Sequence, residues 1–440
     1  MNARTLRTTV CLAGLALAAC SRAEPDPRPS VILVSIDTLR ADHLGLYGYE
    51  RDTSPFLDRF GRDAIVYEHA FTPATWTLIA HMTMLTGLYP NQHGVTEERV
   101  AVAHETPLLA ERLKADGYHT VGLYYPGWVH PRHGFGRGFD VFRPHESAEE
   151  AAEHLAQEMD GLEDGRPYFL FVHLFDVHSG PFQARRHTIY PSPEPFQDQF
   201  MEDAEAILPD MDEVALWESE NLLDAPQIEA LTALYDGGIR HVDTRLSEWF
   251  GELERRGLLA NTLVIITADH GESLQQRGRI SGHGGFWQEG LHVPLIVRPP
   301  DGSRAGQRVE APVHLGDIVP TVLATLGLAP DANLPGRSLL GPLPDERVVF
   351  GSRPPREYVV RWPVKILKSF DEKYFGGDLA ADPAEQKPQF VPRAMYDELR
   401  AQALGPERTW PAPLSIDDIS EDDKDALRAL GYAGEVDDSK

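Results

Sequence analysis

The chain has 440 residues, of which 42% are hydrophobic and 25% are charged, and its formal net charge is −27. This length allows a large buried core and two domains, and the composition is typical of globular enzymes. Nucleic-acid binding depends on basic patches, so this strongly acidic composition excludes nucleic acid as a partner.

The first twenty residues have the features of an export signal. Two arginines, Arg4 and Arg7, precede an apolar stretch at 10–19 that is too short for a normal membrane span. The stretch runs into the sequence LAAC, ending at Cys20, which resembles the lipobox of bacterial lipoproteins. The resemblance implies a lipoprotein signal peptide over residues 1–20 and a lipid on Cys20, which anchors the chain to a membrane. A simple secretory signal is the alternative.

The residues around Cys20 indicate a location. Ser21 follows the cysteine at the position where a signal for retention in the inner membrane would place Asp. The resemblance therefore implies the outer membrane, with the protein facing the periplasm. The acidic, Pro-rich residues 21–30 are expected to form a tether. Cys11 is the other cysteine of the chain, so the mature protein is expected to have no disulfide.

Three short apolar runs each end at a residue that can bind a metal ion or an oxyanion. The run VILVSI (31–36) ends at Asp37, YFLFVHLF (168–175) at Asp176 and His178, and TLVIITA (262–268) at Asp269 and His270. Such runs are typical of strands that are buried on both faces of a parallel sheet. Because ligands bind beyond the carboxyl ends of such strands, we expect these side chains to converge in one site.

The remaining elements alternate between helix and strand. The pattern predicts helices at 54–63, where Ser54 is placed as a cap, 77–86, 106–117, 148–163, 226–256 and 316–328, and further strands at 119–125 and 291–299. This alternation indicates an α/β fold, namely a three-layer α/β/α sandwich with a mostly parallel central sheet.

Two regions depart from this alternation. Between His187 and Ile239 there is no Lys or Arg but thirteen Asp and Glu residues, which is typical of a solvated helix pair, with a lid over the cleft as the alternative. From about residue 345 the sequences VVFGS, REYVVRW and VKILKSF predict short strands, followed by a helix at 420–432. We therefore expect a small C-terminal antiparallel subdomain over residues 344–440.

Seven segments, in the expected order, resemble one known family. They are VILVSIDTLRADHLGLYGY (31–49), TWTLIAHMTMLTGLYPNQHGV (75–95), YFLFVHLFDVHSGP (168–181), NTLVIITADHGESL (261–274), HVPLIVRPPDG (292–302), DLAADPAEQ (378–386) and LRALGYAG (427–434). Together they resemble the sulfatase family of the alkaline phosphatase superfamily. The resemblance implies a sulfatase-like catalytic domain over residues 31–343.

The resemblance places the nucleophile at Thr77. In the family it lies at the start of a helix, ten residues before the Gly of an LTG triplet, which here is Gly87. Sulfatases carry Cys or Ser there, within Cys/Ser-x-Pro-x-Arg, and oxidise it to formylglycine. Thr cannot form formylglycine, and Ile79 and His81 replace the Pro and the Arg. A Thr nucleophile resembles instead the phosphodiesterases and the phospho-headgroup transferases of the superfamily.

A metal ion is expected next to Thr77. Asp37, Asp269 and His270 supply two carboxylates and one imidazole, and with the Thr77 oxygen they suit Zn²⁺ or Mn²⁺. Ca²⁺ and Mg²⁺ stay open as alternatives, although Thr38 replaces a second Asp that a Ca²⁺ site would use.

Further site residues follow from the resemblance. His178 is expected to donate a proton to a substrate oxygen or to the leaving group. His283 is expected to contact the anion or to bind a second metal with Asp176. His81 is either a packed helix residue or a substrate contact, and Tyr125 either lines the pocket or belongs to the core.

The sequence therefore predicts a metal-dependent hydrolase of phosphate, phosphonate or sulfate esters. Two family Lys positions and one family His position are empty in this chain, at Tyr124–Gly127 and within 282–290, which puts ordinary sulfatase chemistry in question. Alternatives are a phospho-headgroup transferase of the same fold and an inactive binding protein. The expected partner is a small-molecule or headgroup ester, and the sequence leaves the oligomeric state open.

Overall fold

The computed structural model describes residues 27–416, apart from 164, 181–188, 191, 209–222, 277–280, 330 and 407. Its centre is an eight-stranded sheet made of β1 Ser30–Ile36, β2 Ile65–Tyr67, β5 His119–Tyr124, β6 Val141–Pro144, β7 Tyr168–Leu174, β8 Thr262–Thr267, β12 Leu295–Arg298 and β13 Arg308–Val309. The strand order is β13-β2-β12-β8-β1-β7-β5-β6. Strands β8, β1, β7, β5 and β6 run parallel, whereas β12 is antiparallel to both neighbours. The prediction of a mostly parallel central sheet is confirmed.

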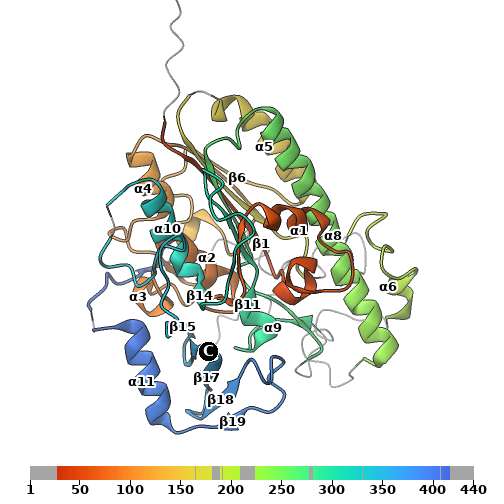
Figure 1. Ribbon diagram of the computed structural model, residues 1–440, viewed down its shortest axis with the longest axis vertical. Coiled ribbons are helices and arrows are strands. Elements are labelled where there is room, and N and C mark those ends of the chain that lie inside the picture. Colours follow the sequence, from red (N-terminus) through yellow and green to blue (C-terminus); the bar gives the residue numbers. More distant parts are fainter. Residues whose placement is uncertain are drawn as a thin grey trace, which may run out of the picture.

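Helices cover both faces of this sheet (Figure 1). One layer holds α2 Thr77–Thr86, α4 Leu109–Ala115 and α10 Ile318–Thr325, and the other holds α1 Pro55–Arg62, α5 Ala148–Leu162 and α8 Ala225–Arg255. Strands β1, β7 and β8 are buried between the layers, which explains their unbroken apolar sequences. Within the described part of the chain, no helix combines the length and the apolar character needed to cross a bilayer.

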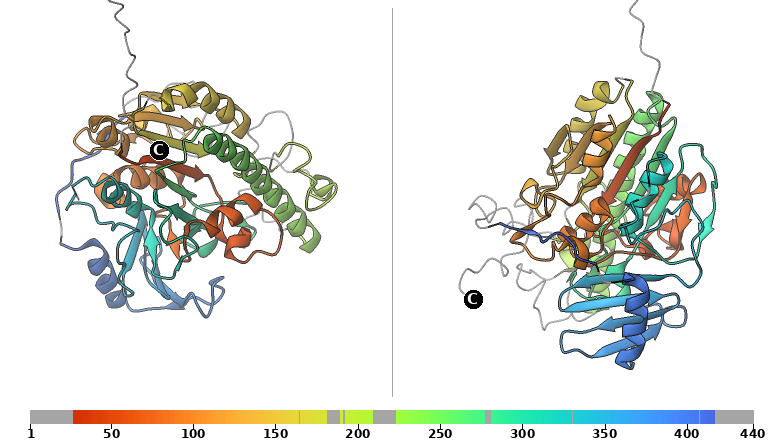
Figure 2. Two further views of the ribbon diagram at one scale, coloured as in Figure 1. Left: turned by 45° about the horizontal axis from the view of Figure 1, so that its top comes forward. Right: turned by 90° about the vertical axis from the view of Figure 1, so that its left-hand side faces the viewer.

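A second sheet forms a separate small unit below the first (Figure 2, right). It is a five-stranded antiparallel sheet of β15 Val348–Arg353, β16 Arg356–Arg361, β17 Val364–Lys368, β18 Tyr374–Asp378 and β19 Gln389–Phe390. The helix α11 Arg393–Leu404 packs on it, and the chain then returns so that β20 Leu414–Ser415 pairs with β4 Val100–Ala101. The predicted antiparallel subdomain is thus present, whereas the predicted helix 420–432 lies outside the described residues.

Smaller elements complete the fold. Two minor sheets pair β10 Ser281–Gly282 with β9 Ser273–Leu274, and β3 Ala70–Phe71 with β11 His292–Val293 and β14 Val313–His314. Short helices are α3 Pro90–His93, α6 Ala204–Ile207 and α9 Gln288–Leu291, with 3₁₀ turns at Ala41–His43, Gly45–Tyr47, Pro131–His133 and Leu315–Asp317.

Three local predictions need correction. The strand expected at 291–299 is divided into β11 and β12 by Pro294, which has no N–H to donate to a sheet. The helix expected from 106 begins only at Leu109, because Pro107 restricts the residue before it. Ser54 precedes α1 as predicted, but its hydroxyl does not cap that helix.

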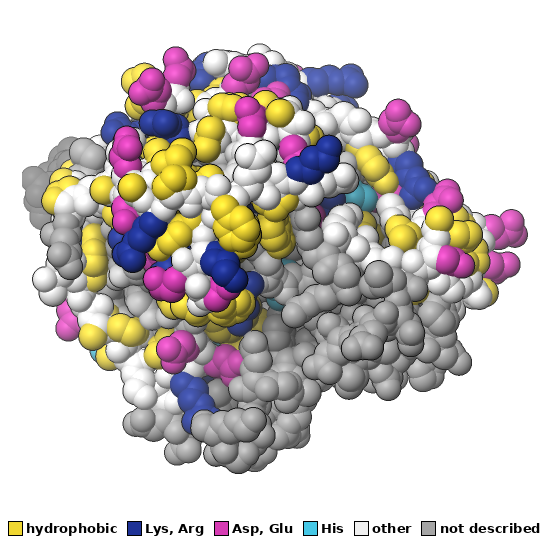
Figure 3. All heavy atoms as spheres, turned by 90° about the horizontal axis from the view of Figure 1, so that it is seen from below, with side chains coloured by type: hydrophobic (Ala, Val, Ile, Leu, Met, Phe, Trp, Pro, Cys, Tyr) yellow, Lys and Arg dark blue, Asp and Glu magenta, His cyan; other side chains and the backbone are white. Residues whose placement is uncertain are grey.

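Several predictions fall on residues that the structure does not describe. These are the signal peptide 1–20 with Cys20, most of the tether 21–30, and residues 188, 191 and 209–222 of the acidic stretch between His187 and Ile239. The described part of that stretch includes α6 and the N-terminal half of α8. At the end of the molecule that holds the C-terminal sheet, Figure 3 shows basic and acidic side chains interspersed among the coloured atoms.

Candidate active site

The predicted metal ligands converge at the carboxyl ends of two paired strands. Strand β1 runs parallel to β8 with Ser35 opposite Thr267, so Asp37 and Asp269 leave the sheet side by side. One ligand atom from each of Asp37, Asp269 and His270 lies within 4.8 Å of the other two. All three side chains are fully buried.

Thr77 joins this group as the first residue of α2. Its hydroxyl donates to Asp37 Oδ2 at 3.3 Å, and the same oxygen lies 3.3 Å from His270 Nε2. The residue before it, Trp76, occupies the N-cap position, and no side chain caps the helix. Thr77 is therefore not the cap of α2, and its hydroxyl faces the acids and the imidazole.

The hydrogen bonds of His270 fix which ring nitrogen is available. Its Nδ1 lies 2.9 Å from the carbonyl oxygen of Gly271, which can only accept, so Nδ1 carries the proton. Burial lowers the pKa of His270 to about 3, and the positive charge of Arg353 acts in the same direction. The ring is therefore neutral near pH 7, and the lone pair of Nε2 faces Thr77 as a metal ligand requires.

Among the described residues, neither carboxylate forms an ion pair with a Lys or an Arg; their ion-pair partners are histidines. Asp37 Oδ1 and Asp269 Oδ2 are buried and form no hydrogen bond within this part of the chain. Burial raises the pKa of Asp37 well above its usual value, and the Asp269 carboxylate raises it further. Burial also raises the pKa of Asp269. Two orphaned carboxylate oxygens beside an imidazole lone pair fit a divalent cation well. Thr38, at φ 56°, donates its backbone N–H to Asp269 Oδ1 at 3.3 Å.

His178 lies at the same end of the sheet, behind an aromatic stack. Its ring stacks on the Phe175 ring, with 4.2 Å between the centroids. The Tyr125 ring also stacks on Phe175, again with 4.2 Å between the centroids. His178 Nδ1 donates to the carbonyl of Ser179, and Nε2 is buried without a partner. Burial, followed by His283, lowers the pKa of His178 to about 3. The neutral ring therefore presents an acceptor at Nε2, and the predicted donor role requires the ring to take up a proton first.

His283 lies beside the predicted ligands, but Asp176 does not join it. The His283 ring centroid is 4.4 Å from that of His270, and its Nδ1 is 3.0 Å from the carbonyl oxygen of Thr75. Asp176 instead accepts from the backbone N–H of Ala148 and belongs to a group with Glu149 and His241, whose ligand atoms lie within 4.8 Å. In the described part of the chain, no potential metal-binding group combines Asp176 with His283.

His81 and His173 lie on the buried side of the site. His81 has no exposed surface, and its Nδ1 is 2.9 Å from the backbone carbonyl oxygen of Thr77. The structure therefore favours the packed alternative for His81 over a substrate contact. His173 Nε2 lies 3.1 Å from Asp37 Oδ2. Sequence reasoning did not single out His173, and the available signal was an imidazole inside the apolar run of β7.

Arg353 is a second residue that sequence reasoning missed. Its guanidinium lies over the Trp76 ring, 4.2 Å from the ring centroid, so it is next to the residue that precedes Thr77. Strand β15 holds it there, because the backbone N–H of Ser352 donates to the carbonyl oxygen of Pro73 at 2.9 Å. The antiparallel subdomain therefore brings a cation to the edge of the site.

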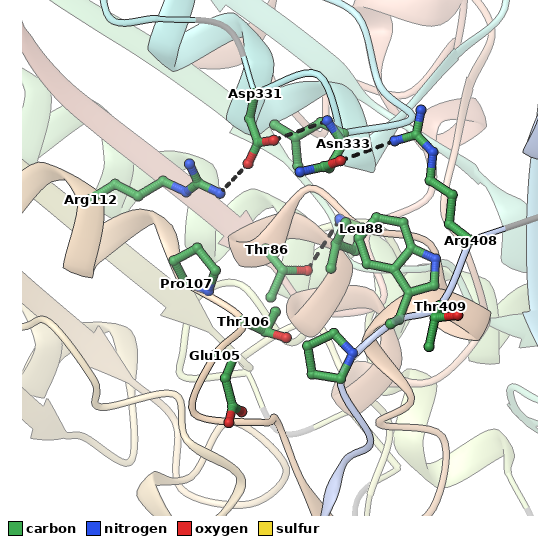
Figure 4. A pocket seen from close by; sticks show the side chains of 13 residues that line it. Thr86, Leu88, Glu105, Thr106, Pro107, Arg112, Asp331, Asn333, Arg408 and Thr409 are labelled. Carbon is green, nitrogen blue, oxygen red and sulfur yellow. Dashed lines mark hydrogen bonds and ion pairs between the residues drawn. The ribbon is translucent and has the colours of Figure 1, made fainter.

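A separate hollow lies at the other end of α2 (Figure 4). Its walls include Thr86, Trp410 and two arginines. Arg112 is paired with Asp331 at 2.7 Å, and Arg408 donates to Asn333 at 3.2 Å. Thr86 follows Thr77 by nine residues of helix, which is about 14 Å along the axis, so this hollow is separate from the group around Thr77.

The fold is a three-layer α/β/α sandwich, and acids, imidazoles and a hydroxyl at a helix start meet at the ends of its strands. This arrangement is typical of α/β ester hydrolases. The model of the Sulfatase family matches residues 29–328. The chain therefore belongs to the sulfatase family, as the resemblance in the sequence indicated, and it is an ester hydrolase.

Individual relatives agree with this assignment. The chain is 25% identical over 396 residues to the multifunctional alkaline phosphatase superfamily protein PehA of Trinickia caryophylli, covering 71% of this chain and 76% of that protein. It is 26% identical over 393 residues to the N-sulphoglucosamine sulphohydrolase of Homo sapiens, covering 81% and 74%. The crystal structure of the phosphonate monoester hydrolase of Agrobacterium radiobacter has the same fold, with a TM-score of 0.68, 22% identity and coverage of 88% and 99%.

Proposed function

We propose that the protein is a metal-dependent hydrolase that cleaves a phosphate, phosphonate or sulfate ester through Thr77. The observation that supports this most directly is the position of the Thr77 hydroxyl, 3.3 Å from both Asp37 Oδ2 and His270 Nε2. Asp37, Asp269 and His270 would hold the metal, for which Zn²⁺ or Mn²⁺ is our choice. When bound, a divalent cation supplies positive charge that favours the Thr77 alkoxide and balances the charge developing on the ester.

The chain's own groups suit displacement in two steps. The Thr77 oxygen, as the alkoxide, forms a bond to phosphorus or sulfur while the bond to the leaving alcohol oxygen breaks, giving an esterified threonine; the second step returns Thr77 as the alkoxide. In the second step, water attacks phosphorus or sulfur and releases Thr77. His178 is suited to accept the proton of that water, because its Nε2 lone pair forms no hydrogen bond within the described part of the chain. Once protonated, the same ring can donate to the next leaving group.

Arg353 is suited to bind the anionic group of the ester. Phosphate, phosphonate and sulfate esters all carry negative charge on their nonbridging oxygens, and guanidinium groups bind such oxygens in a planar, bidentate manner. The guanidinium lies over the ring of Trp76, the residue before Thr77, and its charge acts on His270. This contact stands in for the Lys and Arg residues that the chain lacks at the family positions.

The test is a comparison of Thr77 variants on a panel of aryl sulfate, phosphate monoester, phosphate diester and phosphonate monoester. We expect Thr77→Ala to lower kcat/KM by at least 100-fold on the best ester, and Thr77→Ser to retain part of the activity. Thr86→Ala is the matched control, because Thr86 is a buried threonine of the same helix that bonds only to the backbone. Equal turnover by wild type and Thr77→Ala would exclude Thr77 as the nucleophile.

We also propose that the protein is a lipoprotein of the bacterial cell envelope, anchored through Cys20 to the outer membrane and facing the periplasm. The proposal rests on the basic, apolar and small-residue order of residues 1–20. Cys20→Ala should move the protein from the membrane fraction to the soluble fraction and abolish labelling by a radioactive fatty acid. An unlabelled wild-type protein would contradict the anchor.

A further inference from the structure

Glu272 is a fully buried glutamate two residues after His270, and it takes no part in the displacement proposed for the site. Its carboxylate accepts a bond from the backbone N–H of Ser179 at 3.1 Å and a second bond from the Ser179 hydroxyl. The Tyr190 hydroxyl, at 3.0 Å, and the backbone N–H of Gly282 also donate to this carboxylate. Four donors from three separate segments therefore meet on one side chain.

These bonds exclude a direct chemical role for Glu272. An ionised carboxylate has about four lone-pair positions, and four donors are already directed at this one. In the described part of the chain, no potential metal-binding group includes Glu272. Because all four partners donate, they favour the ionised carboxylate, although burial raises its pKa. Glu272 therefore acts on its neighbours in the protein and not on the ester.

Two of the segments bonded to Glu272 carry histidines of the site. Ser179 follows His178, and the Ser179 carbonyl oxygen accepts the Nδ1 proton of His178. Gly282 precedes His283, whose ring centroid lies 5.4 Å from that of His178. One buried carboxylate thus bonds to the backbone beside both imidazoles.

The bond between His178 and Ser179 determines what the imidazole can do. Glu272 holds Ser179 at its N–H and at its hydroxyl, so the direction of the Ser179 carbonyl is fixed. This carbonyl keeps the ring proton on Nδ1, which leaves Nε2 as an acceptor. If Ser179 were released, the ring could adopt its second tautomer, with the proton on Nε2. In that form it could not accept the proton of the attacking water.

We propose that Glu272 is a positioning residue, which acts through Ser179 to hold His178 in the tautomer whose Nε2 accepts the proton of the attacking water. The inference rests on the proposed function, which assigns that proton transfer to His178. In this step the proton moves to Nε2 while the water oxygen forms its bond to phosphorus or sulfur and Thr77 leaves. Partners that orient the imidazoles of metal sites through such bonds contribute about 10–100-fold to affinity or activity.

A double-mutant cycle separates this role from a purely structural one. Glu272→Gln keeps the shape of the side chain but replaces one acceptor oxygen with a donor amide. We expect it to lower kcat on the best ester by about 10–100-fold in the otherwise wild-type enzyme. In the His178→Ala background it should lower kcat by less than about 3-fold, because no ring is left to position.

Asp243→Asn is the matched control for the cycle. Asp243 is a buried carboxylate that accepts from the backbone N–H groups of Phe56 and Leu57. Its replacement should change kcat by less than about 2-fold in both backgrounds.

Histidine ¹⁵N spectra measure the tautomer of His178 without any turnover. The wild-type signal that disappears in His178→Ala should show a protonated Nδ1 and an unprotonated Nε2. In Glu272→Gln, a second tautomer should appear. If Glu272→Gln fails to fold by circular dichroism, Ser179→Ala removes one of the two bonds between Ser179 and Glu272 and is measured in its place.

The outcomes separate this inference from the proposed function. Equal losses of kcat in both backgrounds, or an unchanged tautomer in the folded variant, would overturn the inference and leave Glu272 as a part of the fold. Full activity of Glu272→Gln would also overturn it, while the nucleophile Thr77 would stand. A protein that shows the change of tautomer but cleaves no ester would contradict the proposed function and leave the link from Glu272 to His178 intact.

Discussion

Asp37→Asn tests the proposed metal site through the free energy of unfolding. We expect the substitution to stabilise the metal-free protein and to destabilise the protein with metal bound. Ligand atoms of Asp37 and Asp269 lie within 4.8 Å of each other, and both side chains are fully buried. At this distance and an effective dielectric constant of about 20, two negative charges repel by about 3.5 kcal/mol. Without metal, Asn at position 37 removes this repulsion but also weakens the bond from His173. We therefore expect the metal-free variant to be more stable than metal-free wild type by about 1–3 kcal/mol.

With metal, the order should reverse. An ion at 100 times its Kd stabilises the folded wild type by about 2.7 kcal/mol, whereas the variant has lost a ligand and gains little. Urea unfolding measured once with a chelator and once with Zn²⁺ or Mn²⁺ would show both differences. Asp243→Asn is the matched control, because Asp243 is a buried aspartate that bonds to the backbone N–H groups of Phe56 and Leu57. Its effect should be the same with and without metal.

The reasoning would be refuted if Asp37→Asn were less stable than wild type in the presence of the chelator. That result would mean that a protein group neutralises Asp37 without an ion. A variant with the same stability difference in both conditions would mean that Asp37 does not bind metal.

Two further predictions concern stability away from the site. Arg347 donates to the fully buried Asp317 carboxylate at 2.6 Å. Arg347→Met leaves this carboxylate without its cation and should lower the free energy of unfolding, measured in urea, by about 3–5 kcal/mol. Adding Asp317→Asn should recover part of the loss, while the exposed Arg393→Met should change stability by less than about 0.5 kcal/mol. Burial lowers the pKa of His93 and of His314 to about 3, so the unfolded state binds protons below pH 6.5 that the native state refuses. The free energy of unfolding should therefore fall as pH drops from 6.5, by about 2 kcal/mol per histidine at pH 5. In His93→Asn, the free energy of unfolding should depend less steeply on pH across this range.

The convergence of Asp37, Asp269 and His270 could be predicted from the sequence because it depends on local patterns. Each follows an apolar run that forms a buried strand, and parallel strands place their carboxyl ends at one edge. The position of Thr77 was predictable from the resemblance, which places the family's nucleophile at a helix start ten residues before Gly87. In the structure, α2 begins at Thr77, and Gly87 follows its last residue at φ 75°.

Other parts of the site depend on contacts that no local sequence pattern predicts. Arg353 is brought to Trp76 by the docking of β15 on Pro73, which joins residues far apart in the chain. The acceptor state of His178 depends on one bond to a backbone carbonyl, which a sequence cannot show. Asp176 follows a strand as Asp37 and Asp269 do, but it bonds to the start of α5 and lies beside Glu149 and His241.

The charge of the site restricts the charge of the ester that it can bind. A chain with a net charge of −27 repels anionic esters, so binding must depend on local cations. Asp37 and Asp269 together bring two negative charges, which a single divalent cation neutralises without surplus. Arg353 then matches a monoanion, such as a sulfate ester, a phosphonate monoester or a phosphate diester. One cation and one guanidinium beside two carboxylates leave a single positive charge, which favours a monoanionic ester over the dianion of a phosphate monoester.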